Sequence, residues 1–174
     1  MKTLVIHPKD PTTDFLSPNY EGKNWNVITH DISDYEMHEL IDSHDRIVML
    51  GHGYHGGLYG HHRIMINFTH VQKLASKELV AVWCHANKFF DQYGLPGFYT
   101  GMIISEPAEA NYYGVEFTES EIDESNKLLA NTLRKTIFDL NMLTKTRYYY
   151  DTYDNRIIKY NKRNLYKAHN LCLN

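Results

Sequence analysis

The chain has 174 residues, a length that suits one domain or one domain with an extension. Hydrophobic residues make up 43% of the sequence and charged residues 22%, which is ordinary for a globular protein and excludes disordered, collagen-like and coiled-coil chains. The net charge is only −3 at pH 7.

The sequence has no stretch that approaches the roughly 18 consecutive apolar residues of a membrane span. The apolar run around Leu4 is shorter than that of a secretory signal. The two cysteines, Cys84 and Cys172, match no zinc-binding spacing and make a poor disulfide framework. We therefore expect a cytoplasmic protein without a membrane partner.

Apolar runs and capping signals alternate along the first two thirds of the chain. Short β-branched and apolar runs predict strands, and Ser33 with Glu36 forms a capping box at the start of a helix. The predicted strands cover residues 3–7, 25–29, 46–50, 79–83 and 101–105. The predicted helices cover residues 34–44, 70–77, 87–93 and a segment that Thr118 or Ser120 caps and that runs to about Leu140. A glycine-rich loop and a small hairpin arm at 64–68 separate the third and fourth strands.

Continuous apolar strands that alternate with helices predict an α/β fold, a three-layer α/β/α sandwich with a mainly parallel sheet buried on both faces. Right-handed crossovers are strongly preferred in such folds. The third strand, at 46–50, is therefore predicted to lie next to the fourth, at 79–83, and parallel to it.

The composition changes near residue 145. Residues 1–144 hold 11 Lys and Arg against 19 Asp and Glu, whereas residues 145–174 hold 7 against 2, with six of the 14 tyrosines. We predict an α/β domain over 1–144 and a basic, tyrosine-rich C-terminal extension over 145–174 that packs on it. The extension could instead offer a surface to nucleic acid or another acidic partner. The acidic body disfavours nucleic acid because it repels phosphate.

Two of the predicted strands end in residues that can carry chemistry. The third strand ends in Gly51-His52-Gly53 and the fourth runs directly into Cys84. Parallel neighbouring strands bring both groups to the carboxyl edge of the sheet, where sites form in α/β folds. A cysteine attacks as its thiolate, which a nearby imidazole supports, and the unobstructed N–H of Gly53 can point at an oxyanion.

This pattern resembles the caspase, gingipain and clostripain group of cysteine peptidases (clan CD). The matching segments are Ile47-Val48-Met49-Leu50-Gly51-His52-Gly53 and Leu79-Val80-Ala81-Val82-Trp83-Cys84, with a glycine-rich turn, a small hairpin and a helix between them. The spacing from His52 to Cys84 is most similar to the short gingipain-type arrangement. The resemblance covers residues 3–140 and leaves the C-terminal extension outside it.

The resemblance implies a caspase-like fold and a cysteine endopeptidase that hydrolyses peptide bonds in a peptide or protein substrate. Cys84 would be the nucleophile and His52 the general acid that protonates the leaving amine. The backbone N–H groups of Gly53 and Cys84 would form the oxyanion hole. Apart from the resemblance, Tyr54 and His55 follow the histidine in the loop and are expected to border the substrate cleft, although a glycine-rich turn can equally be only a turn. The family needs neither a metal nor a cofactor.

Other interpretations of the same residues stay open. Cys84 can be an inert buried thiol and His52 a turn residue, which would leave a catalytically inactive caspase-like module that binds a protein partner through the tyrosine-rich extension. A nucleic-acid-associated protein is the weaker alternative. Three acidic residues follow the fourth or the fifth predicted strand: Asp91, Glu106 and Glu109. If one of them lined the cleft, it would favour a substrate with a basic side chain. Otherwise they are solvated loop charges. A stretch rich in histidine lacks the standard spacings of a metal site.

Overall fold

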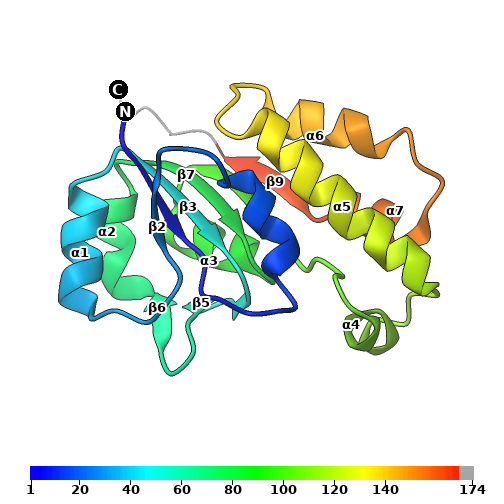
Figure 1. The fold of residues 1–174 in the computed structure, drawn as a ribbon, viewed down its shortest axis with the longest axis horizontal. Helices are drawn as coiled ribbons and strands as arrows, with labels where there is room; N and C mark the ends of the chain where they lie inside the picture. The colour runs from blue at the N-terminus through cyan, green and yellow to red at the C-terminus, as the bar shows by residue number, and fades with distance from the viewer. Residues whose placement is uncertain (169–174) are drawn as a thin grey trace.

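The computed structural model describes residues 1–168 and contains a six-stranded sheet with helices on both faces (Figure 1). The strand order is β2-β1-β3-β7-β8-β9. The first five strands of this order pair in parallel, and β9 is antiparallel to β8. The strands are β1 (Thr3–Ile6), β2 (Asn26–Ile28), β3 (Arg46–Leu50), β7 (Glu78–Val82), β8 (Gly97–Thr100) and β9 (Leu165–Ala168).

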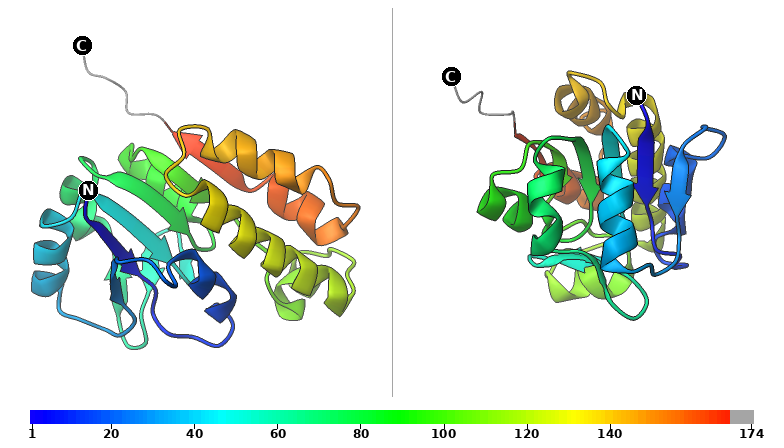
Figure 2. Two further views of the ribbon diagram at one scale, coloured as in Figure 1. Left: turned by 45° about the horizontal axis from the view of Figure 1, so that its top comes forward. Right: turned by 90° about the vertical axis from the view of Figure 1, so that its left-hand side faces the viewer.

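The helices lie in two layers, one on each side of this sheet (Figures 1 and 2). One layer holds α1 (Asp34–Asp42), α2 (Val71–Leu74) and α3 (Ala86–Tyr93), and the other holds the 3₁₀ helix η1 (Asp14–Asn19), α5 (Glu119–Thr136), α6 (Met142–Tyr150) and α7 (Arg156–Lys162). The predicted three-layer α/β/α sandwich with a mainly parallel sheet is confirmed.

No helix within residues 1–168 combines the length and apolar character needed to cross a bilayer.

Alternate residues of each central strand enter two separate cores. Leu4 and Met49 pack against α1, α2 and α3, whereas Val5 and Val48 pack against the layer that contains α5. Burial on both faces explains why these strands are continuously apolar in the sequence. The pairing of β3 with β7 is parallel and in register, with Leu50 opposite Val82, so the predicted adjacency of the third and fourth strands is confirmed.

A second, three-stranded antiparallel sheet lies between β3 and β7 along the chain. It consists of β4 (Gly53–Tyr54), β5 (Gly57–Tyr59) and β6 (Ile64–Ile66), and the 3₁₀ helix η2 (Phe68–His70) follows it. The hairpin arm expected at 64–68 is therefore present, with β6 ending at Ile66. The helix expected over 70–77 is shorter in the structure, where α2 covers Val71–Leu74.

The capping box predicted at Ser33 is confirmed, and of the two caps considered for the long helix, Thr118 is the one that is used. Ser33 and Glu36 exchange hydrogen bonds at the start of α1, and Thr118 and Glu121 do so at the start of α5. The helix predicted to reach about Leu140 ends at Thr136 instead. Ile137 leaves the helical conformation and Phe138 adopts a positive φ of 64°, which an α-helix cannot contain.

The fifth strand was predicted at 101–105, and this position is wrong. Strand β8 occupies Gly97–Thr100, where Gly97 comes so close to β7 that an added Cβ would lie 2.4 Å from the Leu79 carbonyl oxygen. Ile104 is fully buried without being in a strand, because the side chain of Asn161 accepts from its N–H (2.8 Å) and donates to its carbonyl oxygen (2.9 Å). This one side chain makes the two backbone hydrogen bonds that a neighbouring strand would otherwise make.

The predicted division between residues 144 and 145 falls inside α6. The segment after it contributes α7 and then β9, which pairs with β8 at the edge of the central sheet. Its aromatic and aliphatic residues Tyr150, Ile158 and Leu165 belong to the same core as α5. Residues 169–174 of the predicted extension, with Cys172, lie outside the described part of the chain.

Replacing Tyr150 by phenylalanine is expected to stabilise the fold. The side chain is almost fully buried, and its hydroxyl has no hydrogen-bond partner among residues 1–168. An unpaired buried hydroxyl costs roughly 1–3 kcal/mol, so Tyr150→Phe should raise the free energy of unfolding by about 1 kcal/mol in a urea titration. The exposed Tyr148 is the matched control, and Tyr148→Phe should leave stability unchanged.

The same pair of variants gives a pH signature. Burial raises the pKa of Tyr150 far above its ordinary range, whereas in the unfolded chain the phenol ionises near pH ~10. Because the pKa of Tyr150 is higher in the folded state than in the unfolded state, its contribution to the free energy of unfolding is fully present below pH ~10. Above that pH the contribution falls by about 1.4 kcal/mol per pH unit. Tyr150→Phe should remove this part of the alkaline loss, and an unchanged slope would contradict the assignment.

Candidate functional site

Cys84 lies on the sharp turn that joins β7 to α3. The preceding residue, Trp83, is buried, and the following residue, His85, takes a left-handed conformation with φ of 68°. The His85 N–H donates to the Gly101 carbonyl oxygen at 3.1 Å, which fixes the turn against the end of β8. A non-glycine residue with positive φ is uncommon, and such strain often accompanies a functional position. Cys84 therefore sits at the carboxyl edge of the sheet, as the sequence indicates.

His52 lies at the same edge, two residues after the end of β3 at Leu50. Its Nε2 atom is 2.6 Å from Thr12 Oγ1, and Thr12 donates its hydroxyl proton to Asp10 Oδ1 at 2.6 Å. Since that hydroxyl has one proton to give, it accepts from His52, which places the neutral ring's hydrogen on Nε2. Asp10 Oδ1 is 3.8 Å from His52 Nε2. The free lone pair is then on Nδ1.

The Asp10–Thr12–His52 chain is a feature that sequence reasoning missed. Asp10 and Thr12 belong to the loop between β1 and η1, in which no functional residue is expected from the sequence. Hydrogen bonds from Thr12, through its hydroxyl and its backbone N–H, lower the pKa of Asp10, so this carboxylate is ionised at neutral pH. A short Asp-x-Thr segment in the loop after β1 could have indicated a partner for a histidine, but only its three-dimensional path identifies His52 as that histidine.

Cys84 and His52 line one small cavity. Its volume is about 20 Å³, which is enough for one water molecule. Its walls come from the ends of β3 and β7, the η1 region, α5 and the segment after β8. The lining residues are Thr13, Phe15, Leu16, Gly51, His52, Val82, Trp83, Cys84, Ile103, Ser105 and Leu129. The fold thus brings the two predicted catalytic residues to the same small cavity.

The thiol of Cys84 is in an environment that favours its protonated form. Its sulfur is 3.7 Å from the Ile103 carbonyl oxygen and 3.8 Å from Glu109 Oε1. Burial, and secondly the negative charge of Glu109, raise the pKa of the thiol to about 12. Thiolate is the reactive form, so Cys84 in this conformation is a weak nucleophile.

Gly53 is held tightly between β7 and the hairpin. A Cβ added there would lie 2.3 Å from Trp83 Cδ1 and 2.6 Å from the Gly57 carbonyl oxygen. Trp83 Nε1 donates to the Tyr54 carbonyl oxygen at 3.2 Å, so the indole ring is anchored to the strand that contains Gly53. This contact explains why a bulky residue precedes Cys84: Trp83 supports the loop that carries His52.

Tyr54 and His55, the predicted substrate-binding residues, face other side chains of the hairpin. Tyr54 stacks on Tyr59 with 5.1 Å between ring centroids and meets His55 edge-on at 4.9 Å. Neither residue contributes to the cavity that contains Cys84 and His52. The structure therefore brings together Cys84 and His52, next to Gly53, but not Tyr54 and His55.

The three acidic residues considered from the sequence have different surroundings. Asp91 accepts from the Tyr99 hydroxyl at 3.0 Å, on α3 and away from the cavity lining. Glu106 is the N-cap residue of α4 (Pro107–Tyr112). Glu109, one turn further along α4, is the one whose carboxylate contacts the Cys84 sulfur. Within residues 1–168, no group of three or more His, Cys, Asp and Glu residues is arranged to hold a metal ion.

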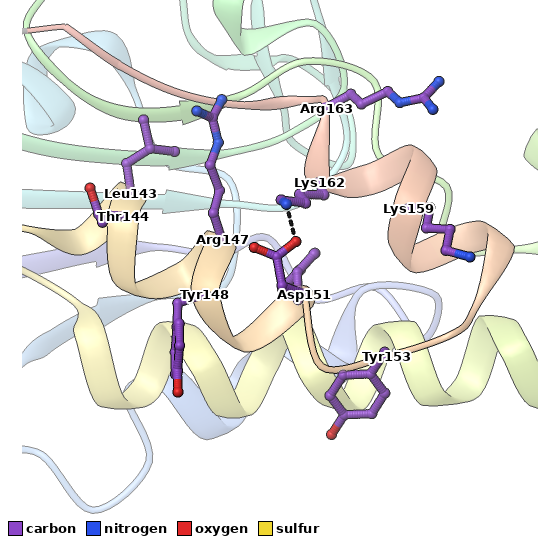
Figure 3. A pocket seen from close by; sticks show the side chains of 10 residues that line it. Leu143, Thr144, Arg147, Tyr148, Asp151, Tyr153, Lys159, Lys162 and Arg163 are labelled. Carbon is purple, nitrogen blue, oxygen red and sulfur yellow. Dashed lines mark hydrogen bonds and ion pairs between the residues drawn. The ribbon is translucent and has the colours of Figure 1, made fainter.

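A larger cavity, of about 820 Å³, lies between α6 and α7 and is lined mainly by basic and tyrosine residues (Figure 3). Its lysines are paired, Lys162 with Asp151 and Lys159 with Asp154. Arg147, which points towards β9, donates to the Leu165 carbonyl oxygen at 2.8 Å. These contacts link α6, α7 and β9 and give the basic residues a structural role.

Comparison with known proteins gives little similarity. No protein-family model matches the chain, and no curated protein matches it significantly. Among solved structures, the Trp repressor binding protein from Bacillus subtilis is similar, with 14% sequence identity and a TM-score of 0.39, over 74% of this chain and 97% of that one. A TM-score below 0.5 indicates neither a family nor a function.

Proposed function

We propose that the protein is a cysteine peptidase in which Cys84 and His52 act as a catalytic pair. The observation that carries this proposal is their shared cavity at the carboxyl edge of β3 and β7. A thiol and an imidazole on adjacent parallel strands are the groups that acyl transfer requires. The Asp10–Thr12–His52 hydrogen bonds support it further, because they orient the ring and leave its Nδ1 lone pair free.

The proposed reaction follows the usual two steps of covalent catalysis. The Cys84 proton passes to His52, Sγ bonds to the substrate carbonyl carbon, and the N–H groups of Gly53 and Cys84 hold the oxyanion. The carbon–nitrogen bond breaks as His52 gives its proton to the leaving amine. Water then attacks the thioester, loses a proton to His52, and releases the carboxylic acid and the Cys84 thiol.

A second candidate, a caspase-like module that binds a protein partner without catalysis, is favoured by one observation. The high pKa of the Cys84 thiol keeps it protonated at neutral pH in this conformation. Peptide cleavage separates the two candidates, because only the peptidase needs a reactive thiolate.

The test is incubation of the wild-type protein with a complex mixture of peptides, followed by mass spectrometry of the new chain ends. A peptidase should produce cleavages with a shared preference around the cut, and Cys84→Ser should produce none of them. A mixture left intact, or cleavage that persists in Cys84→Ser, would contradict the proposed function.

A further inference from the structure

The wall of the cavity beside Cys84 comes from the irregular segment after β8 and from the short helix α4. Ile103 and Ser105 of this segment line the cavity, and Glu109 of α4 reaches the sulfur. Since a carboxylate oxygen accepts hydrogen bonds and carries negative charge, Glu109 stabilises the neutral thiol and opposes the thiolate.

Glu109 is held in this position by its own neighbours. The Ser105 N–H and hydroxyl both donate to Glu109 Oε2, at 2.7 and 3.1 Å. That leaves Oε1 facing the Cys84 sulfur. Asn126 of α5 donates to the Ser105 carbonyl oxygen at 2.8 Å and so ties the same segment to the helical layer.

We propose that Glu109 restrains Cys84 in a resting state, and that displacement of the segment from Ser105 through α4 releases the thiol and opens the site. The proposal rests on the proposed function, since it describes how that function's nucleophile is controlled. One movement would accomplish both steps: it would take the carboxylate from the sulfur and widen a cavity of about 20 Å³ that admits no peptide.

The position of α4 suits such a movement. The helix has six residues, of which Ala110 alone is buried, and it lies at the periphery, below the N-terminal end of α5 (Figure 1). Ala110 packs in a small cluster with Ile104, Ile122 and Ile157 that is separate from the two main cores. Elements with few buried apolar contacts open at a low free-energy cost.

Other charged or titratable groups also surround the thiol. They are Glu106 at the start of α4, Tyr113 at its end, Tyr160 of α7, His52 across the cavity and the neighbouring His85. Glu106 is the best control residue, because it lies on the same segment and carries the same charge without a hydrogen bond to the sulfur.

The experiment measures the rate at which iodoacetamide alkylates Cys84 between pH 6 and 10, in a Cys172→Ser background so that Cys84 is the only thiol. Glu109→Gln keeps the shape of the side chain and its bonds from Ser105 but removes the charge. Its alkylation rate at pH 8 should be about tenfold higher than in the parent, with the pH profile moved at least one unit towards acid. Glu106→Gln should stay close to the parent.

Ser105→Ala provides a second, independent variant. It removes one of the two bonds that hold Glu109 and should give a smaller increase, and it still tests the proposal if Glu109→Gln does not fold. An alkylation rate in Glu109→Gln equal to the parent's would overturn the proposal, and a lower rate would assign Glu109 as a base that takes the thiol proton.

Failure of the proposed function gives a different result from failure of the restraint. If Glu109→Gln is alkylated faster but no variant with Cys84 cleaves peptides, the restraint holds and the peptidase proposal falls. If the wild type cleaves peptides and Glu109→Gln leaves alkylation unchanged, the peptidase proposal holds and the restraint falls.

Discussion

The Cys84→Ala variant is expected to lose peptide cleavage by a factor of about 10⁴ or more in kcat/KM, because no other group can form the thioester. His52→Ala is expected to lose about 10²- to 10⁴-fold, the usual contribution of a general acid or base. Both should appear in steady-state kinetics on a peptide identified from the cleaved mixture.

The control for these variants is His55→Ala. His55 lies on the adjacent turn, is exposed, and does not line the cavity. It should retain close to wild-type kcat, and thermal unfolding should show that all three variants remain folded. A His52→Ala variant with full activity would refute the role of His52, whatever the result for Cys84.

Gly53→Ala is expected to destabilise the fold by about 3 kcal/mol, at the upper end for overpacking. The new methyl group would lie 2.3 Å from Trp83 Cδ1 and 2.6 Å from the Gly57 carbonyl oxygen, and neither the anchored indole nor the hairpin backbone can move freely. Because Trp83 precedes Cys84, the shift should also abolish activity. Urea unfolding of the variant measures the cost.

Gly22→Ala is the matched control for this prediction. Gly22 has nothing within 4 Å of an added Cβ, but its φ is 76°. Its cost should therefore come only from the left-handed backbone and amount to about 1 kcal/mol. Equal losses in the two variants would show that the contact with Trp83 does not decide the stability at Gly53.

The parts of the fold that the sequence predicts best are those buried on both faces. Strand β3 matches its predicted range, and β7 differs by one residue at each end, because a strand buried on both faces is apolar along its whole length. The capping box at Ser33 is equally a local signal, since donor and acceptor lie three residues apart.

The parts that the sequence does not predict depend on distant partners. The apolar run after Gly101 is typical of a strand. In the structure, however, the backbone N–H and carbonyl groups of Ile104 bond to the side chain of Asn161, which is 57 residues away along the chain. Strand β9 has only four residues, one of them the basic Lys167, and it becomes a strand by pairing with the otherwise open edge of β8.

The candidate site shows the same division. The positions of His52 and Cys84 at one edge follow from strand order, which the sequence indicates. The sequence does not indicate the side chains that contact them. Thr12 bonds to His52 from 40 residues away along the chain, and Glu109 contacts Cys84 from 25 residues away. Both belong to segments outside the sheet, whose paths no local pattern determines.

The measurement that tests the peptidase proposal most directly is covalent labelling by a peptide that carries an acyloxymethyl ketone, with the adduct located by peptide mapping. The proposal predicts a single adduct on Cys84, faster in Glu109→Gln and lost in His52→Ala, because the electrophile needs both the thiolate and the imidazole. A protein that takes up no label when folded, in the wild type and in Glu109→Gln alike, and is labelled only after denaturation would contradict it.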